Sequence, residues 1–333
     1  MRARGLFILV IAAAAAAGFG MPHLLPGYLV NILTEALIFG LFAMSLDLMI
    51  GYTRLESFGH AAAYGLGAYA SALLLLSFDI PMLIVIPMAA IITGVVAMPI
   101  AWVCTRSTGI SFAMLTLAFA QLFYASVYQF KDFSGGSDGI AGIARRAGPF
   151  GIDFFQTKIG YFYLVLIILI LSFLFCRSLV ASPFGQVLAG IRENEVKTRT
   201  LGYNTRAYRM VIVVLAYAFG GLAGALYAPL AGFASPELFF WRMSGMVLIM
   251  VIIGGRGTLV GPILGGAVFL FLEHELSALP MVRELWPLIF GSIFIAVILF
   301  APQGLWGLFR SWREKRRIGV VSKPQSDAPH AAS

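Results

Sequence analysis

The chain has 333 residues, of which 60% are hydrophobic and 11% are charged, and its mean hydropathy is +0.91. Soluble domains carry roughly 25% charged residues, so this composition excludes a soluble globular class. Apolar runs of membrane-spanning length recur along the chain and predict an all-α polytopic membrane protein, whereas a β-barrel would show short alternating strands.

Ten apolar runs are predicted to cross the membrane. They lie at 5–22, 29–50, 60–78, 82–104, 109–128, 160–177, 210–231, 244–254, 258–273 and 285–302. With the N-terminus inside, most of the 23 Lys and Arg residues fall in inner segments, as cytoplasmic loops require. Both termini are therefore expected in the cytoplasm. The net charge of +8 follows from this bias, and no nucleic-acid partner is expected.

The domain prediction places a transmembrane domain at 1–308 and a basic, then disordered, cytoplasmic tail at 309–333. The first 20 residues also fit a cleaved signal peptide, an alternative to the first span. The loop 129–159 is expected on the outer face. The two cysteines, Cys104 and Cys176, end apolar runs and are predicted to be packing residues, so we expect no metal and no cofactor.

The run 244–254 is too short to cross about 30 Å of hydrocarbon at 1.5 Å per residue. The sequence Gly254-Gly-Arg-Gly257 follows it and predicts a broken helix, which is tolerated where the backbone is buried in protein. Small residues at four-residue spacing predict close helix packing. They include Gly220 with Gly224, and Gly257 with Gly261 and Gly265.

Ionisable residues inside spans are costly and are candidates for function. Glu35 and Asp47 lie in the second span, and His60 opens the third. Glu35 is equally consistent with lining a path and with joining helices, whereas structural roles are favoured for Asp47 and His60. A salt bridge from Arg54 to Glu56 or Asp47 is also expected.

The segment 182–204 is polar and charged, unlike its surroundings. Ser182 and Pro183 are typical of a helix start, and Gly202 of a helix stop. Val187, Ile191, Thr198 and Leu201 recur at helical spacing and predict one apolar face. A solvated amphipathic helix explains the pattern, and so does a cytoplasmic docking element.

No phosphate-binding loop or metalloprotease motif occurs in the chain. An enzyme is therefore weakly supported. If the protein is a transporter, its energy source is either another chain or an ion gradient, and the segment 182–204 is suited to contact a motor protein.

Several stretches together resemble the membrane subunit of branched-chain amino-acid ABC transporters, over residues 30 to 308. They are Asn31-Ile-Leu-Thr-Glu-Ala-Leu37, Gly51-Tyr-Thr-Arg-Leu-Glu-Ser-Phe-Gly-His-Ala-Ala-Ala-Tyr-Gly-Leu-Gly-Ala-Tyr69, Thr116-Leu-Ala-Phe-Ala120, Gly190-Ile-Arg-Glu-Asn-Glu195, Leu201-Gly-Tyr203, Gly254-Gly-Arg-Gly-Thr-Leu-Val-Gly-Pro262 and Ala301-Pro-Gln-Gly304.

The resemblance implies a ten-helix importer permease in a bacterial inner membrane. It also implies a sister permease, two ATP-binding subunits and a periplasmic solute-binding protein as partners, with branched-chain or related amino acids as substrates. By the same likeness, 182–204 holds the coupling helix that contacts the ATPase. Its candidate contact residues are Arg192, Glu193, Asn194, Glu195 and Gly202.

Candidates for the translocation path on this resemblance are Glu35, Ser57, Gly59, His60 and Tyr64. The sequence Lys197-Thr-Arg-Thr200 departs from the family pattern, which often has Ala and Glu there, so the facing ATPase groove is expected to differ in charge. The main alternative is an ion-driven secondary transporter with Glu35, Asp47 and His60 as a relay. A membrane enzyme or scaffold is the third possibility.

Overall fold

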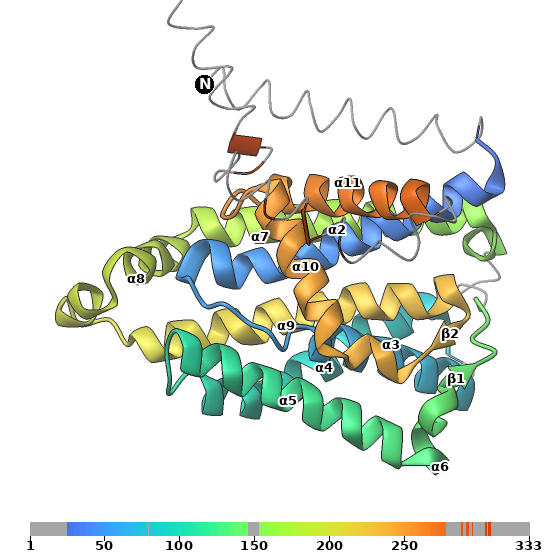
Figure 1. Ribbon diagram of the computed structural model, residues 1–333, viewed down its shortest axis with the longest axis horizontal. Helices are drawn as coiled ribbons and strands as arrows, with labels where there is room; N and C mark the ends of the chain where they lie inside the picture. The colour runs from blue at the N-terminus through green and yellow to red at the C-terminus, as the bar shows by residue number, and fades with distance from the viewer. Residues whose placement is uncertain are drawn as a thin grey trace, which may run out of the picture.

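The computed structural model describes residues 25–78, 80–145 and 153–277, with a few single positions between 288 and 307. The predicted span 5–22 and the tail 309–333 lie outside the described residues, as does most of the predicted span 285–302. The described part is a bundle of helices lying roughly side by side, with one helical arm projecting from one end (Figure 1).

The long helices match the predicted runs to within a few residues. They are α2 (Gly27–Thr53), α3 (Ala61–Ser77), α4 (Met82–Cys104), α5 (Ile110–Gln129), α7 (Lys158–Ala181), α9 (Thr205–Ala231), α10 (Trp241–Gly254) and α11 (Val260–Ser277). The projecting arm is α8 (Pro183–Thr200).

Short elements connect the helices. They are α6 (Lys131–Ser134), η2 (Gly136–Asp138), β1 (Ile140–Ala141), η3 (Asp153–Gln156), β2 (Phe233–Ala234) and η4 (Pro236–Phe239). The two strands pair antiparallel, with Ile140 opposite Ala234. This pairing joins the loop after α5 to the loop after α9 at the end of the bundle opposite α8 (Figure 1).

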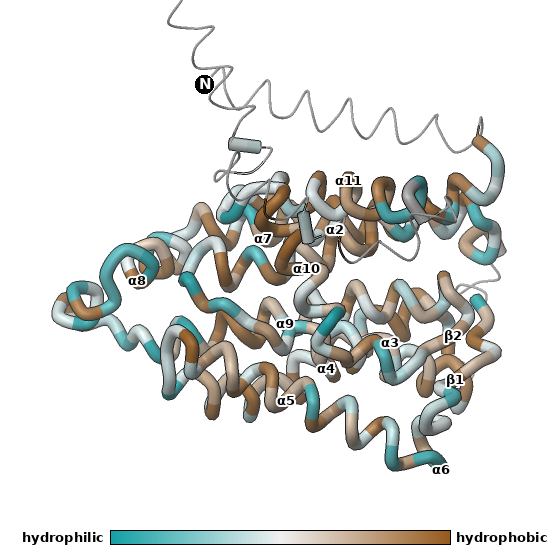
Figure 2. The backbone as a smooth tube through the Cα atoms, in the orientation of Figure 1, coloured by the Kyte–Doolittle hydropathy of each residue, from teal (hydrophilic) through white to brown (hydrophobic). Residues whose placement is uncertain are grey.

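Five helices in the described part are long and apolar enough to cross a membrane: α2, α4, α5, α7 and α9. The helices α3 and α10 are apolar but shorter. The described residues therefore support an all-helical membrane protein with five candidate spans, and two of the ten predicted runs lie wholly or mostly outside these residues. Apolar residues fill the body of the bundle, and hydrophilic residues gather on α8 (Figure 2).

The core lies where α2, α3 and α9 meet, and glycines bring their backbones together. The residues of α2 from Ile38 to Gly51 are buried. A Cβ atom added to Gly67 of α3 would overlap the backbone of Gly221 in α9, and one on Gly224 would overlap the carbonyl of Tyr64. The predicted close packing at Gly224 is thus confirmed, and the α3–α9 contact leaves no room for larger residues.

The predicted helix break after the eighth run is also confirmed. α10 ends at Gly254, and a turn through Gly255 and Gly257 leads to α11, with φ of 109° and 74° at these two glycines. Such positive φ angles favour glycine. Gly261 and Gly265 in α11 then pack against the backbone of α10, as the small-residue spacing predicted.

Candidate functional site

The projecting helix α8 begins and ends where the sequence predicted. Pro183 occupies the first turn, and Gly202 follows the helix with φ of 91°. Ser182 precedes the helix, but its hydroxyl donates to the carbonyl of Leu179 and does not cap the new helix. Gly202 has open space around it, so only its backbone conformation requires glycine.

α8 is not one continuous helix, because Asn194 has the non-helical angles φ −157° and ψ 101°. The side-chain oxygen of Asn194 accepts a hydrogen bond from the Lys197 amide at 2.9 Å, so Asn194 caps a second helical piece. The Thr198 hydroxyl donates to the Asn194 carbonyl at 3.0 Å. Residues 195–200 therefore form a separate tip, which we call the α8 tip.

Glu195 ties the α8 tip to the bundle. Its carboxylate accepts hydrogen bonds from Thr205 at 3.0 Å and from Arg209 at 3.3 Å, both in α9, and lies 3.4 Å from Arg199. The Arg209 guanidinium also donates to the carbonyl of Thr105 at the end of α4, at 3.0 Å. Glu195 thus connects the tip to two helices of the bundle through one buried arginine.

Arg192 ties the first part of α8 to α2. Its guanidinium donates to the carbonyl of Gly51 at 2.9 Å. The same end of α2 holds the turn between α10 and α11, because Tyr52 donates to the Gly257 carbonyl at 3.1 Å. Arg192 therefore lies where α2, α8 and the 254–259 turn meet.

Asp47 anchors the 254–259 turn. Its two carboxylate oxygens accept from the Gly257 amide at 2.6 Å and from the Leu259 amide at 3.1 Å, and Asp47 is fully buried. The expected pairing of Arg54 with Asp47 or Glu56 does not occur: Glu56 instead lies 3.8 Å from Arg256. The structural role predicted for Asp47 is supported, and its partners are backbone amides.

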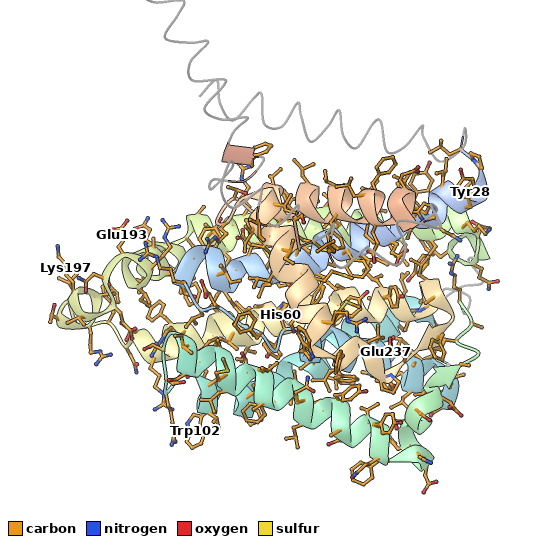
Figure 3. All side chains as sticks on the ribbon, in the orientation of Figure 1. Tyr28, His60, Trp102, Glu193, Lys197 and Glu237 are labelled. Carbon is orange, nitrogen blue, oxygen red and sulfur yellow. The ribbon has the colours of Figure 1, made fainter. Side chains whose placement is uncertain are left out.

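The α8 tip and the residues on either side of it present both charged and apolar side chains to their surroundings. Glu193 and Lys197 point outward at the far end of the molecule (Figure 3). Val196 and Leu201 are each 71% exposed. Of the predicted apolar face, Ile191 and Thr198 are buried, whereas Leu201 follows the helix and is exposed. Gly185 and Leu188 complete the buried face.

A second group of candidates lies inside the bundle, in the extended segment 54–60 and the first turn of α3. His60 lies near the middle of the bundle (Figure 3) and has no exposed surface. Its Nε2 atom is 2.8 Å from the hydroxyl of Ser45. Ser45 lies about 12 Å from the end of α2, because a helix rises 1.5 Å per residue, so His60 is well inside the bundle. The imidazole stacks on Phe42 with ring centroids 5.3 Å apart, and its edge contacts Tyr217.

The neighbours of His60 are also buried. Ser57 accepts a hydrogen bond from the Gly59 amide at 3.3 Å, and the Gly59 carbonyl accepts from Tyr217 at 3.2 Å. A Cβ atom on Gly59 would overlap the Thr116 carbonyl of α5. The Tyr64 hydroxyl is fully buried and has no partner among the described residues. The core of this chain thus brings together four candidate residues: Ser57, Gly59, His60 and Tyr64.

Glu35 interacts with this group only at Tyr64, among the described residues. It is partly buried in α2 and interacts electrostatically with Tyr64 as well as with His274 and Glu273 of α11. Within the described ranges, no hydrogen bond or ion pair joins Glu35, Asp47 and His60. The three residues proposed as an ion relay therefore have separate surroundings.

Three contributors to these sites escaped the sequence analysis. The predicted span 210–231 leaves out Arg209, although this residue lies inside α9 and is 5% exposed. Ser45 and Tyr52 bear single hydroxyls in an apolar run and carry no spacing signal. For Arg209, the cost of a charged residue within a spanning helix is the signal that would have identified it.

Comparison with known protein families gives a match over most of the chain. Residues 28–298 match the model of the family described as branched-chain amino acid transport system / permease component. The chain belongs to this permease family. No solved structure matches the chain significantly.

Individual relatives agree with the family assignment. The chain is 27% identical over 322 residues to the high-affinity branched-chain amino acid transport system permease protein LivM of Escherichia coli (strain K12), covering 90% of this chain and 74% of the relative. It is 28% identical over 157 residues to a probable permease protein LivM of Methanocaldococcus jannaschii, covering 43% of this chain and 45% of the relative.

A relative with another printed role also matches. The autoinducer 2 import system permease protein LsrC of Salmonella paratyphi B is 27% identical over 190 residues, covering 55% of this chain and 53% of the relative. Permeases of this family are transport subunits of ABC importers and generally work with ATPase and solute-binding partners. The chain is accordingly a membrane transport subunit and not an enzyme.

Proposed function

We propose that this chain is the permease subunit of an ATP-driven importer and that the α8 tip is its contact with the ATPase subunits. The importer would take up branched-chain or related amino acids. A sister permease would complete the translocation path, and a periplasmic solute-binding protein would deliver the substrate.

The observation that carries this proposal is the way in which α8 is attached. A docking element must be exposed to its partner and must also transmit the partner's movement. Val196 and Leu201 are exposed, while Glu195 and Arg192 bond to α9 and α2. A displacement of the tip would therefore move several helices together, as a shear or rocking transition requires. A solvated helix would need neither the exposed apolar pair nor these two ties.

The ATPase contact would include Arg192, Glu193, Asn194, Glu195 and Gly202 in different roles. Glu193 would face the partner directly, since it points outward. Arg192, Asn194 and Glu195 would set the direction of the tip through their bonds to the chain itself. Gly202 would allow the chain to turn back into α9.

The orientation follows from the positive-inside rule. The α8 end of the bundle carries Arg106, Arg192, Lys197, Arg199 and Arg206, so we place this end in the cytoplasm. With the predicted spans at 5–22 and 285–302, the permease would have ten crossings and two cytoplasmic termini. The domain would then extend over 1–308, with the outer loop 129–159 in the periplasm and a cytoplasmic tail at 309–333.

The translocation path would run beside the segment 54–60. Non-helical backbone inside a bundle is typical of transporter binding sites near the bilayer centre. Ser57, Gly59, His60 and Tyr64 offer hydroxyl, imidazole and backbone groups there, and the buried Tyr64 hydroxyl has no partner in the described part of the chain. Glu35 would lie nearer the outer end, where it would meet the substrate before His60.

The test is uptake of radiolabelled leucine by proteoliposomes containing the complete transporter. ATP inside the vesicles should drive uptake, and a protonophore should leave it unchanged. An ion-driven carrier, with Glu35, Asp47 and His60 as its relay, would give the reverse result. Competition by isoleucine, valine, amides and urea would then define the substrate class.

A further inference from the structure

A basic cavity lies beside the α8 tip, between the end of α4 and the start of α9. Its volume is about 380 Å³. Eight residues line it: Thr105, Arg106, Arg199, Tyr203, Asn204, Thr205, Arg206 and Arg209. Half of them are arginines, a density of positive charge that is costly to maintain without an anion.

The carboxylates of the chain do not balance this charge. Glu195 is shared between Arg199 and Arg209. Arg106 and Arg206 have no carboxylate partner among the residues that the structure describes. Their guanidinium groups instead lie over the ring of Trp102, at 3.8 Å and 5.9 Å from its centroid. The cavity therefore keeps an excess of positive charge.

Arg209 lines the cavity and carries a buried donor without a partner among the described residues. Its side chain is almost completely buried, and its terminal nitrogens donate to Glu195 and to the Thr105 carbonyl. Its Nε atom is buried and has no hydrogen-bond partner in the described part of the chain. A buried N–H without a partner costs free energy, so the guanidinium is held at a cost beside the cavity, where its positive charge favours an anion. The N-terminus of α9, which begins at Thr205, adds a favourable dipole.

The surroundings of the cavity indicate which anion fits. Met98 and Trp102 lie one turn apart on α4, and Ile110 and Met114 lie one turn apart on α5. All four side chains are exposed. Each pair forms an apolar face on the outside of its helix, where the bilayer would lie, and Trp102 borders the cavity through its contacts with Arg106 and Arg206. A protein carboxylate or a free phosphate has no apolar part that could cover these side chains, whereas the acyl chains of a lipid would cover them.

We propose that this cavity binds the phosphate of an anionic phospholipid, with the acyl chains on the apolar surface of α4 and α5. Arg106 and Arg206 would contact the phosphate oxygens, Arg209 would add positive charge from the wall of the cavity, and Trp102 would lie at the level of the headgroups. The lipid would balance the arginines that hold the α8 tip. This inference rests on the membrane location of the chain and not on coupling to ATP.

The test uses the full chain purified in detergent and native mass spectrometry to count bound lipids. The probes are dioctanoyl phosphatidylglycerol, dioctanoyl phosphatidylcholine and inorganic phosphate. We expect phosphatidylglycerol to bind most tightly. Arg106→Gln and Arg206→Gln should each weaken its binding by about tenfold, the effect of one charge-assisted hydrogen bond.

Lys197→Gln is the matched control, because it removes one positive charge from the neighbouring α8 tip at an exposed position that does not line the cavity. It should leave lipid binding unchanged. Equal binding of the two lipids, or equal losses in all three variants, would overturn the proposal. Binding of inorganic phosphate as tight as that of phosphatidylglycerol would overturn the lipid assignment. Variants that lose association with the ATPase but keep lipid binding would also overturn the lipid assignment, because they would assign the cavity to a protein partner.

Discussion

The Glu195 carboxylate lies 3.3 Å from the Arg209 guanidinium, and this contact joins the α8 tip to the second turn of α9. Arg209 is buried and continues the connection to the carbonyl of Thr105. The pair is therefore more than a surface ion pair, whose contribution to stability is usually small. Loss of Glu195 would leave a buried cation with only backbone partners.

We predict that Glu195→Lys abolishes uptake while the chain still reaches the membrane. The substitution removes the acceptor of Thr205 and Arg209 and places a like charge beside Arg209 and Arg199. The loss of one charged hydrogen-bond partner alone should reduce the free energy of unfolding by roughly 1–3 kcal/mol. Uptake in proteoliposomes and the thermal unfolding midpoint measure the two effects.

Glu56→Lys is the control for the effect of this charge reversal on stability. Glu56 is exposed and lies 3.8 Å from the exposed Arg256, so its loss should change the unfolding midpoint little. Normal uptake and normal coupling in Glu195→Lys would contradict the proposed role of the α8 tip.

Gly202→Leu should also stop uptake, for a reason of backbone conformation. Gly202 has φ of 91° and open space around it, so leucine would meet strain and no steric clash. The strain should be about 1–2 kcal/mol and should shift the turn into α9. Gly202→Asn should retain more uptake, because asparagine tolerates positive φ better. Gly245→Leu, also in open space but without positive φ, is the control. Equal activity of the leucine and asparagine variants at position 202 would exclude this explanation.

Asp47→Leu should destabilise the protein more than Asp47→Asn. The leucine variant leaves the amides of Gly257 and Leu259 without acceptors, at roughly 1–3 kcal/mol for each buried donor. Asparagine keeps one side-chain oxygen and should lose about half as much. Thermal unfolding in detergent gives the comparison, with the exposed Asp132→Asn as a control. If Asp47 served ion transfer alone, the two variants would be similarly stable and similarly inactive.

Ser57→Cys tests whether the segment 54–60 borders the translocation path. Ser57 is buried in this state, and both native cysteines are buried, so background labelling should be low. A charged methanethiosulfonate reagent should modify the new thiol several times faster during ATP-driven turnover than at rest. Ser71→Cys is the matched control, since Ser71 is equally buried in α3 but donates to the Ala68 carbonyl within its own helix. Labelling of Ser57→Cys that ATP does not change would argue against a path beside this segment.

Helix positions were predictable from the sequence because hydrophobic runs and turn residues carry local signals. The Gly254–Gly257 break and the Gly202 stop belong to this class, since glycine marks both. The break at Asn194 was not predicted. Asparagine is a favoured N-cap residue, but the helical pattern of its neighbours concealed a change of direction inside the segment.

The long-range contacts of the site were not predictable from local patterns. Asp47 and Gly257 are 210 residues apart, and neither residue carries a local sequence signal that identifies the other as its partner. Arg209 was assigned to a loop because the predicted span began one residue later. The depth of His60 escaped prediction for the same reason: an extended segment that turns back into a bundle looks like an ordinary connection until its partners are known.

The segment 54–60 also constrains the order in which the protein is assembled. The Ala61 amide donates to Ser244 at 2.8 Å, and the Gly59 carbonyl accepts from Tyr217. Both partners are synthesised long after α2 and α3 have left the ribosome, and chains fold from the N-terminus during synthesis. The start of α3 must therefore stay hydrated or bound to the insertion machinery until α9 and α10 have been synthesised and can form these two hydrogen bonds. A chain truncated before residue 217 would lack both partners, which makes this short segment a late step in biogenesis.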